Sequence, residues 1–151
     1  LEGFRATVFR QTMFAEFEHD IHLRDQNCEP LTAESLTEWY YDLNKKYFGD
    51  DIVVDEEIGL EWARIPHFYY NYYVYQYATG YAAATSLANQ IVSEGSTAVE
   101  RYKSFLKAGS SDDPIEVLKK AGVDMTEKQP IEEALKVFEE KLNEFESLIK
   151  K

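Results

Sequence analysis

Apolar side chains recur along the chain at steps of three and four residues, a spacing that places them on one face of an α-helix. Over residues 1–24 this pattern predicts one long helix with an apolar stripe at Phe9, Met13, Phe17 and Ile21. Similar stripes run over residues 32–48 and from Pro130 to the end of the chain. The one extended apolar run, residues 52–54, has no partner strand. We therefore predict an all-α fold of about six helices in one compact unit.

Residues that begin and end helices mark the boundaries between these segments. Ser, Thr and Asp side chains accept hydrogen bonds from free N–H groups at a helix start, and glycine commonly follows a helix end. The predicted start signals are Thr32, Thr97 with Glu100 in the spacing of a capping box, and Asp113 before Pro114. The predicted end signals are Gly49, Gly109 and Gly122. Between them, we expect an extended connector from residue 50 and a short helix over residues 57–63.

The stretch over residues 65–84 carries seven of the eleven tyrosines and one of the three histidines. Pro66 lacks a backbone N–H and disfavours the helical conformation in the residue before it, so a new element begins there. We predict a tyrosine-rich helix that starts at His67 and continues past Gly80 to about residue 92.

Two interpretations of this tyrosine-rich helix stay open at this point. It is either a core helix, whose phenol hydroxyls bind neighbouring groups or water, or the wall of a cleft. In a cleft wall, the phenols and the imidazole of His67 face a polar ligand. Gly80 and the alanines at 82–84 form a small-residue surface, which we expect to pack closely against another helix.

Charge and cysteine content narrow the class of protein. A formal net charge of −12 argues against nucleic acid and anionic membranes as partners. Cys28 is the single cysteine and forms no internal disulfide, which fits a reducing, cytoplasmic compartment. No signal peptide opens the chain, and no apolar run is long enough to cross a membrane. The chain begins at Leu1 without a start methionine, so we expect a segment of a longer protein.

The sequence Glu18-His19-Asp20 with His22 gathers candidate metal ligands on one helix. The strong helical zinc motif, HExxH, places its histidines four residues apart with a glutamate between them. That motif is absent from the sequence, so we interpret this segment as a solvated helix end. The acidic residues between positions 50 and 57 lack the spacing and the glycine of a calcium loop.

His67 with its neighbouring tyrosines is a second candidate. A neutral imidazole or a phenol donates a hydrogen bond to a carbonyl oxygen and stabilises the oxyanion that forms from it. The adjoining sequence offers no serine, cysteine or carboxylate as an evident nucleophile. If this stretch is catalytic, it therefore assists chemistry that other groups perform.

Four segments resemble the C-terminal region of the oligoendopeptidase F family, bacterial zinc metallopeptidases related to thimet oligopeptidase. They are RATVFRQTMFAEFEH (Arg5–His19), LNKKYFG (Leu43–Gly49), EWARIPHFYYNYYVYQYATG (Glu61–Gly80) and DPIEVLKKAGVDM (Asp113–Met125). The resemblance covers essentially all 151 residues, and the order and spacing of the segments make it specific.

This resemblance implies a larger all-α, prolate molecule with a deep channel. In the family, an HExxH helix supplies two zinc ligands and the catalytic glutamate, and a later glutamate is the third ligand. These residues would all precede Leu1, so residues 1–151 would be the C-terminal helical portion of the catalytic domain without its zinc site. Zinc would then belong to the full-length enzyme, which hydrolyses internal bonds of short peptides. We expect the isolated chain to be inactive and its partner to be the missing N-terminal part.

The resemblance also assigns roles to individual residues. In related enzymes, a histidine followed by tyrosines faces the zinc, binds the peptide carbonyl and stabilises the tetrahedral intermediate. His67 matches that histidine, and Tyr75 best matches the tyrosine before the long helix. The second family tyrosine lies in a glycine-rich loop that is shorter here, so Tyr69, Tyr70 or Tyr72 could take its place, and we favour Tyr70.

We thus expect catalytic roles for His67, Tyr75 and Tyr70, and substrate-binding roles for Tyr69 and Tyr72. Most other tyrosines are assigned to packing. The alternative is a non-enzymatic helical module that binds a protein partner through its aromatic surface.

Overall fold

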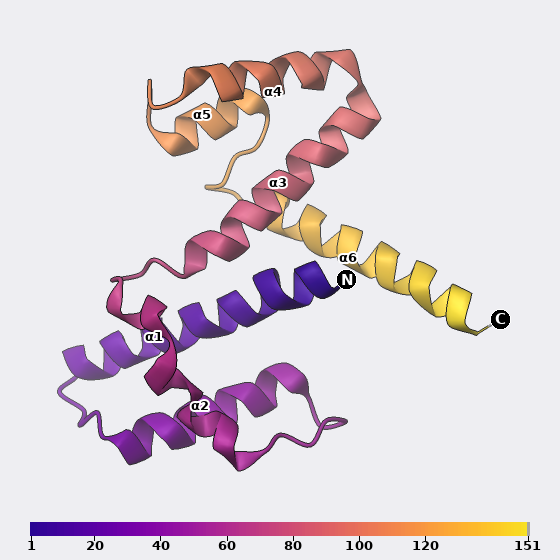
Figure 1. Cartoon of the computed structure of the whole chain (residues 1–151). Helices are drawn as coiled ribbons and strands as arrows, with labels where there is room; N and C mark the ends of the chain where they lie inside the picture. Colours follow the sequence, from indigo (N-terminus) through magenta and orange to yellow (C-terminus); the bar gives the residue numbers. More distant parts are fainter. Residues whose placement is uncertain (151) are drawn as a thin grey trace. The chain divides into compact units, whose positions relative to one another are not determined.

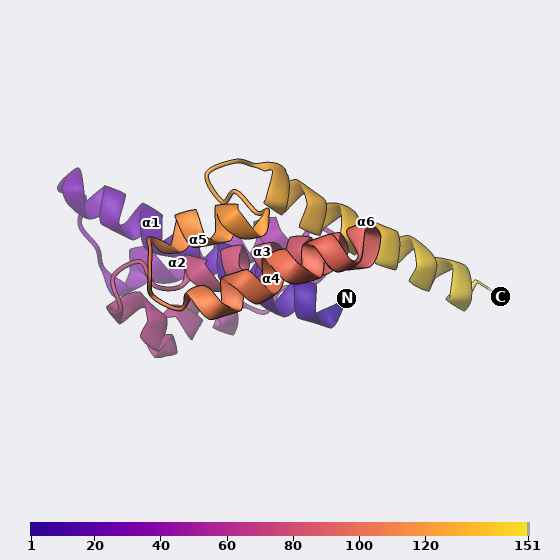
Figure 2. The same ribbon diagram turned by 90° about the horizontal axis from the view of Figure 1, so that it is seen from above.

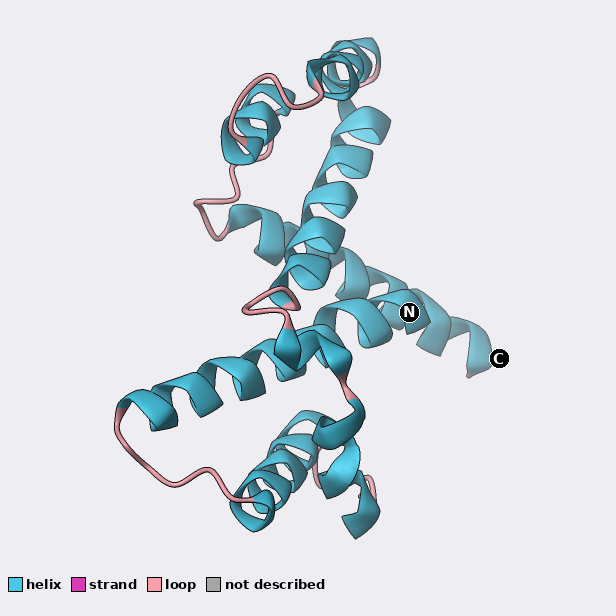
Figure 3. Cartoon of the chain, turned by 60° about the vertical axis from the view of Figure 1, so that its left-hand side comes forward, coloured by secondary structure: helices cyan, strands magenta, loops and turns pink. Residues whose placement is uncertain are grey.

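Every regular element over residues 1–150, the part of the chain that the structure describes, is a helix (Figures 1 and 3). This computed structural model confirms the predicted all-α fold. The elements are η1 (Phe4–Phe9), α1 (Arg10–Gln26), α2 (Ala33–Phe48), η2 (Glu56–Arg64), η3 (Pro66–Tyr69), α3 (Tyr75–Glu94), α4 (Ser96–Ala108), α5 (Pro114–Ala121) and α6 (Gln129–Ile149). η1 is a π-helix, and η2 and η3 are 3₁₀-helices. Within residues 1–150, no helix combines the length and the hydropathy needed to cross a membrane.

The chain forms two compact units, each with its own core, where the sequence pattern predicted one. The first unit is Arg5–Ala78, and the second joins Leu1–Phe4 to the residues from Thr79 onward. The boundary between Ala78 and Thr79 falls inside α3. An apolar stripe reveals that a helix face is buried but not which core buries it, so the stripes gave no sign of this division.

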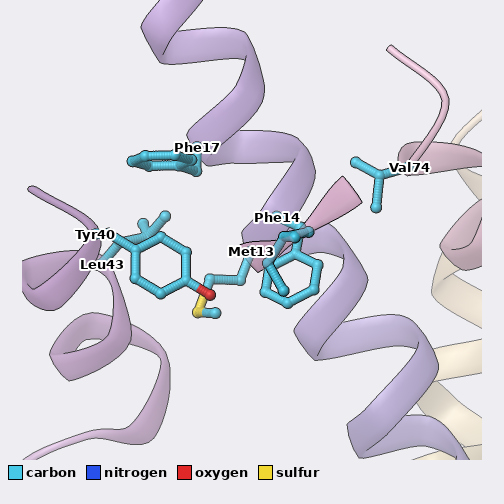
Figure 4. Close-up of a cluster of buried hydrophobic side chains, with 7 residues drawn as sticks. Met13, Phe14, Phe17, Tyr40, Leu43 and Val74 are labelled. Atoms are coloured by element: carbon cyan, nitrogen blue, oxygen red, sulfur yellow. The ribbon is translucent and has the colours of Figure 1, made fainter. Parts of the chain in front are cut away.

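In the Arg5–Ala78 unit, the apolar stripes of α1 and α2 supply most of one buried cluster. Its members are Met13, Phe14, Phe17, Tyr40, Leu43, Ile65 and Val74, six of which are labelled in Figure 4. The ring of Phe17 meets the ring of Tyr40 edge-on, with centroids 5.0 Å apart, a favourable arrangement of two aromatic quadrupoles. The packing of α1 against α2 thus follows directly from the two stripes.

A buried carboxylate ties η2 to both of these helices. The side chain of Glu61 lies in the interior, where its Oε2 accepts a hydrogen bond of 2.9 Å from the Tyr40 hydroxyl. Its Oε1 accepts a hydrogen bond of 2.7 Å from Arg10 Nη2, and Arg64 donates to the same oxygen. A buried charge is tolerated only when it is paired and hydrogen-bonded, and Glu61 meets both conditions. This network fixes η2, which leads directly into the tyrosine-rich stretch.

η2 also lies unusually close to α2. A Cβ atom on Gly59 would lie only 2.9 Å from the backbone oxygen of Thr37, so this position requires glycine. Beside it, Trp62 Nε1 donates a hydrogen bond of 3.2 Å to Thr37 Oγ1.

In the second unit, α4 and α5 lie side by side (Figures 1 and 2). Its core comprises Ala83, Leu87, Ala121 and Val123, with Tyr102, Phe105, Leu118 and Met125 packed around them. Ala82 and Ala83 of α3 are buried, as predicted for the small-residue surface. The predicted close packing is wrong for Gly80 and Ala84, which are exposed, and a Cβ atom on Gly80 would meet no atom within 4 Å. The ring of Phe4 contacts Tyr81 and Phe138, with centroids 4.9 and 5.3 Å away.

Most predicted helix boundaries are confirmed. Thr32 accepts a hydrogen bond from the backbone N–H of Ser35, and Asp113 accepts one from Ile115. The predicted end glycines follow α2, α4 and α5 with positive φ at Gly49, Gly109 and Gly122.

The predicted capping box at Thr97 is wrong. α4 begins one residue earlier, at Ser96, after Gly95 with φ 67°, and no side chain caps it. Thr97 therefore lies inside the first turn, where its hydroxyl does not occupy the N-cap position.

The predicted tyrosine-rich helix from His67 is also wrong in its first part. His67 lies in η3, residues 70–74 form no regular element, and α3 begins only at Tyr75. Asn71 and Tyr72 have φ of 47° and 61°, a left-handed conformation that cannot continue a right-handed helix. The prediction holds from Tyr75 onward, because α3 runs through Gly80 to Glu94.

Candidate functional site

Three tyrosine rings surround His67, and together they form what we call the His67–tyrosine cluster: His67, Tyr70, Tyr73 and Tyr77. The ring of Tyr73 is parallel to the imidazole, with centroids 6.1 Å apart. The rings of Tyr70 and Tyr77 meet it edge-on at 6.2 and 5.5 Å. His67 Nε2 lies 3.3 Å from the hydroxyl oxygen of Tyr77, so imidazole and phenol are within hydrogen-bonding distance.

The local backbone explains how residues so close in sequence gather around one ring. η3 carries His67, and the left-handed turn at Asn71 and Tyr72 reverses the chain before α3 begins. Tyr73 lies two residues before α3, and Tyr77 lies in the first turn of that helix. Their rings contact each other edge-on, with centroids 5.5 Å apart.

The phenol of Tyr77 is a hydrogen-bond donor at neutral pH. A side-chain hydrogen bond with Tyr73 raises the pKa of Tyr77 above its usual value, and desolvation raises that pKa further. The Tyr77 hydroxyl therefore keeps its proton and can donate it in a hydrogen bond to an acceptor such as a carbonyl oxygen.

The cluster combines solvent access with unused hydrogen-bonding capacity. The side chains of Tyr70, Tyr73 and Tyr77 are all exposed, Tyr70 to 58%. The Nδ1 atom of His67 is buried and has no hydrogen-bond partner among residues 1–150. Buried polar atoms are rarely left unpaired, because their desolvation is then uncompensated. The exposed phenols, rather than this buried nitrogen, are therefore the groups of the cluster that a polar ligand on the surface can reach.

The structure brings together only some of the residues singled out from the sequence. His67 and Tyr70 belong to the cluster. Tyr69, at the end of η3, is 76% exposed, and Tyr75, the first residue of α3, is 50% exposed. The ring of Tyr72 stacks instead on His22 of α1, with centroids 4.6 Å apart.

Sequence reasoning missed Tyr73 and Tyr77. The spacing of three and four residues between Tyr70, Tyr73 and Tyr77 was a usable signal for a shared face. A continuous helix from His67 was assumed, however, and in such a helix His67 would not be surrounded by these three rings.

The candidate metal ligands on α1 are not gathered into a larger cluster among the described residues. Within residues 1–150, no group of three or more His, Cys, Asp or Glu side chains could hold a metal ion. The candidate segment on α1 has other contacts: Glu18 binds the backbone N–H of Tyr72, and His22 stacks on the Tyr72 ring. Glu18 is also buried, so the interpretation of this segment as a solvated helix end is wrong for that residue.

Comparison with known proteins gives a consistent group of relatives. The profile described as Peptidase family M3 matches residues 1–137. Oligopeptidase PepF of Bacillus subtilis (strain 168) is 72% identical over 151 residues, which are 100% of this chain and 22% of the relative. Group B oligopeptidase PepB of Streptococcus agalactiae serotype III (strain NEM316) is 54% identical, again over 100% of this chain and 25% of the relative.

A solved structure agrees with these sequence matches. The crystal structure of oligoendopeptidase-F from Enterococcus faecium superposes with a TM-score of 0.94 at 56% identity, covering 98% of this chain and 28% of that chain. The present chain thus spans about a quarter of the length of the relatives it matches.

Proposed function

Because the chain belongs to peptidase family M3, we propose that it is the C-terminal helical part of a zinc-dependent oligoendopeptidase. In this proposal the complete enzyme hydrolyses internal bonds of short peptides in the cytoplasm and binds neither nucleic acid nor membranes. The observation that carries this proposal is the match over all 151 residues to an oligopeptidase more than four times as long.

In this proposal the His67–tyrosine cluster forms the wall of the active site that receives the peptide carbonyl. Hydrolysis of a peptide bond builds negative charge on the carbonyl oxygen, and preorganised donors stabilise that charge. The imidazole of His67 and the hydroxyls of Tyr70 and Tyr77 are such donors. The distance of 3.3 Å between His67 Nε2 and the Tyr77 hydroxyl oxygen supports Tyr77 as a tyrosine that works with His67.

The other predicted tyrosines have places around this wall. Tyr75 remains a candidate donor at the exposed start of α3. Tyr69 is exposed in η3, close to His67 in sequence. Its phenol can hydrogen-bond to the backbone of a bound peptide, whatever the side chains of that peptide are. Tyr72 contributes through the turn that its backbone forms, so in this proposal the role of Tyr72 in substrate binding is indirect.

In this proposal the zinc is bound by residues elsewhere in the full-length enzyme. In support, no group of three or more His, Cys, Asp or Glu side chains within residues 1–150 could hold a metal ion, and Glu18 and His22 contact Tyr72 instead. We therefore assign this chain the binding and orientation of the carbonyl and leave the attack on it to groups elsewhere in the enzyme.

Exposed apolar side chains support a missing partner segment. Leu148 and Ile149 on α6 are 61% and 64% exposed, and Phe145 and Leu142 of the same helix are exposed too. Apolar patches of this kind mark surfaces that are normally covered. The proposed cover is the N-terminal part of the same enzyme.

The test measures zinc content and cleavage of an internally quenched fluorescent peptide for two proteins: the isolated chain and the full-length protein that contains it. We expect stoichiometric zinc and chelator-sensitive cleavage for the longer protein, and neither for the isolated chain. Stoichiometric zinc or cleavage in the isolated chain would contradict the proposal. If the longer protein also lacked zinc and cleavage activity, the alternative of a non-enzymatic binding module would replace the oligoendopeptidase proposal.

A further inference from the structure

The turn between Tyr70 and Tyr73 holds two consecutive residues in a conformation that ordinary side chains avoid. Asn71 has φ 47° and Tyr72 has φ 61°. Asparagine tolerates the left-handed region, whereas a bulky residue such as tyrosine enters it rarely. A backbone conformation of this kind persists only where the surrounding structure holds it.

Glu18 supplies the contact that holds the turn. It lies on α1 and is only 1% exposed. Its Oε1 accepts a hydrogen bond of 2.7 Å from the backbone N–H of Tyr72, the residue with the less favourable conformation. A buried side-chain oxygen that accepts from a backbone N–H in an irregular turn satisfies two groups that would otherwise be unpaired.

His22 reinforces the same turn from the next helical turn of α1. Its imidazole stacks on the ring of Tyr72, with centroids 4.6 Å apart and planes 28° from parallel. Glu18 and His22 are four residues apart, and so lie on the same face of α1. Glu18 thus binds the backbone N–H of Tyr72, and His22 contacts its ring.

We propose that Glu18 is a positioning residue for the catalytic wall: through the Tyr72 N–H it fixes the turn that sets Tyr70 and Tyr73 beside His67, with His22 assisting. The proposal rests on the function proposed above. Tyr70 and Tyr73 flank the turn directly, and both rings contact His67. A turn that relaxed to an ordinary conformation would move these rings away from the imidazole.

The experiment compares Glu18→Gln with Glu18→Met in the full-length protein. Glutamine keeps an oxygen that accepts from Tyr72, whereas methionine fills a similar volume without an acceptor. We expect Glu18→Met to lower kcat about 10- to 100-fold, the cost of misplacing catalytic groups by about an ångström, at little changed zinc content. Glu18→Gln should stay within about threefold of the wild type. Glu16→Met, on the same helix but outside the turn, is the matched control and should leave kcat unchanged.

Amide hydrogen exchange of residues 70–74 gives a second measurement that does not depend on activity. Glu18→Met should speed exchange in this segment while Glu18→Gln and Glu16→Met do not. Wild-type kcat and wild-type exchange in a folded Glu18→Met variant would overturn the proposal. If that variant fails to fold, His22→Ala takes its place. We then expect a lowered kcat and faster exchange in His22→Ala, and wild-type values of both in His22→Phe, which keeps a ring to stack on Tyr72. Unchanged values in His22→Ala would then overturn the proposal.

A parallel His67→Ala variant separates this proposal from the one on which it rests. If His67→Ala lowers kcat but Glu18→Met does not, only the positioning role fails. If His67→Ala leaves kcat unchanged, the catalytic wall itself fails, and the exchange rates of residues 70–74 still decide whether Glu18 holds the turn.

Discussion

The hydroxyl of Tyr77 and the imidazole of His67 form a polar pair within the cluster, with 3.3 Å between the hydroxyl oxygen and Nε2. In a pair of this kind, each group fixes the orientation of the other. The hydroxyl can still donate outward when the imidazole donates to it, and that is what a carbonyl-binding wall requires. The proposed catalytic role of these residues therefore depends on single atoms, and it can be tested by removing them.

We expect Tyr77→Phe in the full-length protein to lower kcat about 100-fold, because loss of one oxyanion donor commonly costs that much. The aromatic ring and its packing remain, so KM, zinc content and the melting temperature should change little. Steady-state kinetics with the quenched peptide provides the measurement. Tyr102→Phe removes a phenol oxygen from the second unit and serves as control. Equal kcat values in the two variants would show that the Tyr77 hydroxyl takes no part in the reaction.

The hydroxyl of Tyr40, unlike that of Tyr77, contributes to the stability of the fold. It donates to Glu61 in the interior, and burial together with that hydrogen bond raises the pKa of Tyr40. Tyr40→Phe would leave one oxygen of the buried Glu61 carboxylate short of a donor. We predict a free energy of unfolding lower by about 1–3 kcal/mol, the usual cost of an unsatisfied buried group.

Urea denaturation of the chain measures this difference. Tyr41→Phe is the control, because the Tyr41 hydroxyl makes a longer hydrogen bond of 3.3 Å to the backbone oxygen of Val54. Its loss should cost less than about 1 kcal/mol. A Tyr40→Phe variant as stable as the control would mean that the Arg10 and Arg64 contacts suffice for Glu61.

At the scale of elements, α1 and α2 are joined by a polar contact as well as by their apolar stripes. Glu16 of α1 accepts hydrogen bonds from Lys46 and, at 2.8 Å, from the Tyr47 hydroxyl of α2. Desolvation works to raise the pKa of Glu16, but these two hydrogen bonds outweigh it, and the pKa falls below its usual 4.5.

This lowered pKa makes the α1–α2 contact sensitive to acid. A carboxyl group with a depressed pKa in the folded state stabilises the fold above its unfolded pKa, and the contribution is lost as the pH falls through the folded value. Glu16→Gln should therefore be less stable than the wild type above about pH 5, by less than about 1 kcal/mol for so exposed a pair. The difference should shrink toward about pH 3. Urea midpoints across this range measure it, with the exposed Glu38→Gln as control, and a difference that grows in acid would refute the assignment.

The elements also show where sequence reasoning succeeds and where it stops. Helical stripes and local caps, such as Thr32 and Asp113, depend on neighbours within one helix, and they were predictable. The segment before Tyr75 was not, because its left-handed turn is held by Glu18, 54 residues away. The same long-range dependence explains why the cluster is only partly predictable. The family resemblance points to His67 and Tyr70, but Tyr73 and Tyr77 join them only because of the turn.

At the scale of the whole molecule, the chain is a large fragment of a longer family architecture. It spans about a quarter of its relatives, and it leaves large apolar side chains uncovered on α6 and around residues 52–60. All side chains of α6 from residue 139 to 149 are exposed. A complete protein rarely leaves such a surface open.

We predict that the isolated chain binds a hydrophobic fluorescent dye and self-associates, whereas the full-length protein does neither. Phe145→Gln with Leu148→Gln should reduce both effects, because these side chains form part of the uncovered α6 surface. Val92→Gln, which changes a single 87% exposed side chain on α3, is the control. Dye fluorescence and analytical ultracentrifugation are the measurements. Equal dye binding by the isolated chain and the full-length protein would argue against a covering partner.

The separation of 54 residues between Glu18 and Tyr72 also bears on the order of folding. Closing so long a loop costs chain entropy before the hydrogen bond can form, so the turn is fixed only after α1 has docked within its unit. The wall around His67 is then among the last features of the Arg5–Ala78 unit to become ordered. A nascent or partly unfolded chain contains all of its tyrosines without their arrangement, so the proposed substrate-binding wall exists only when the unit has finished folding.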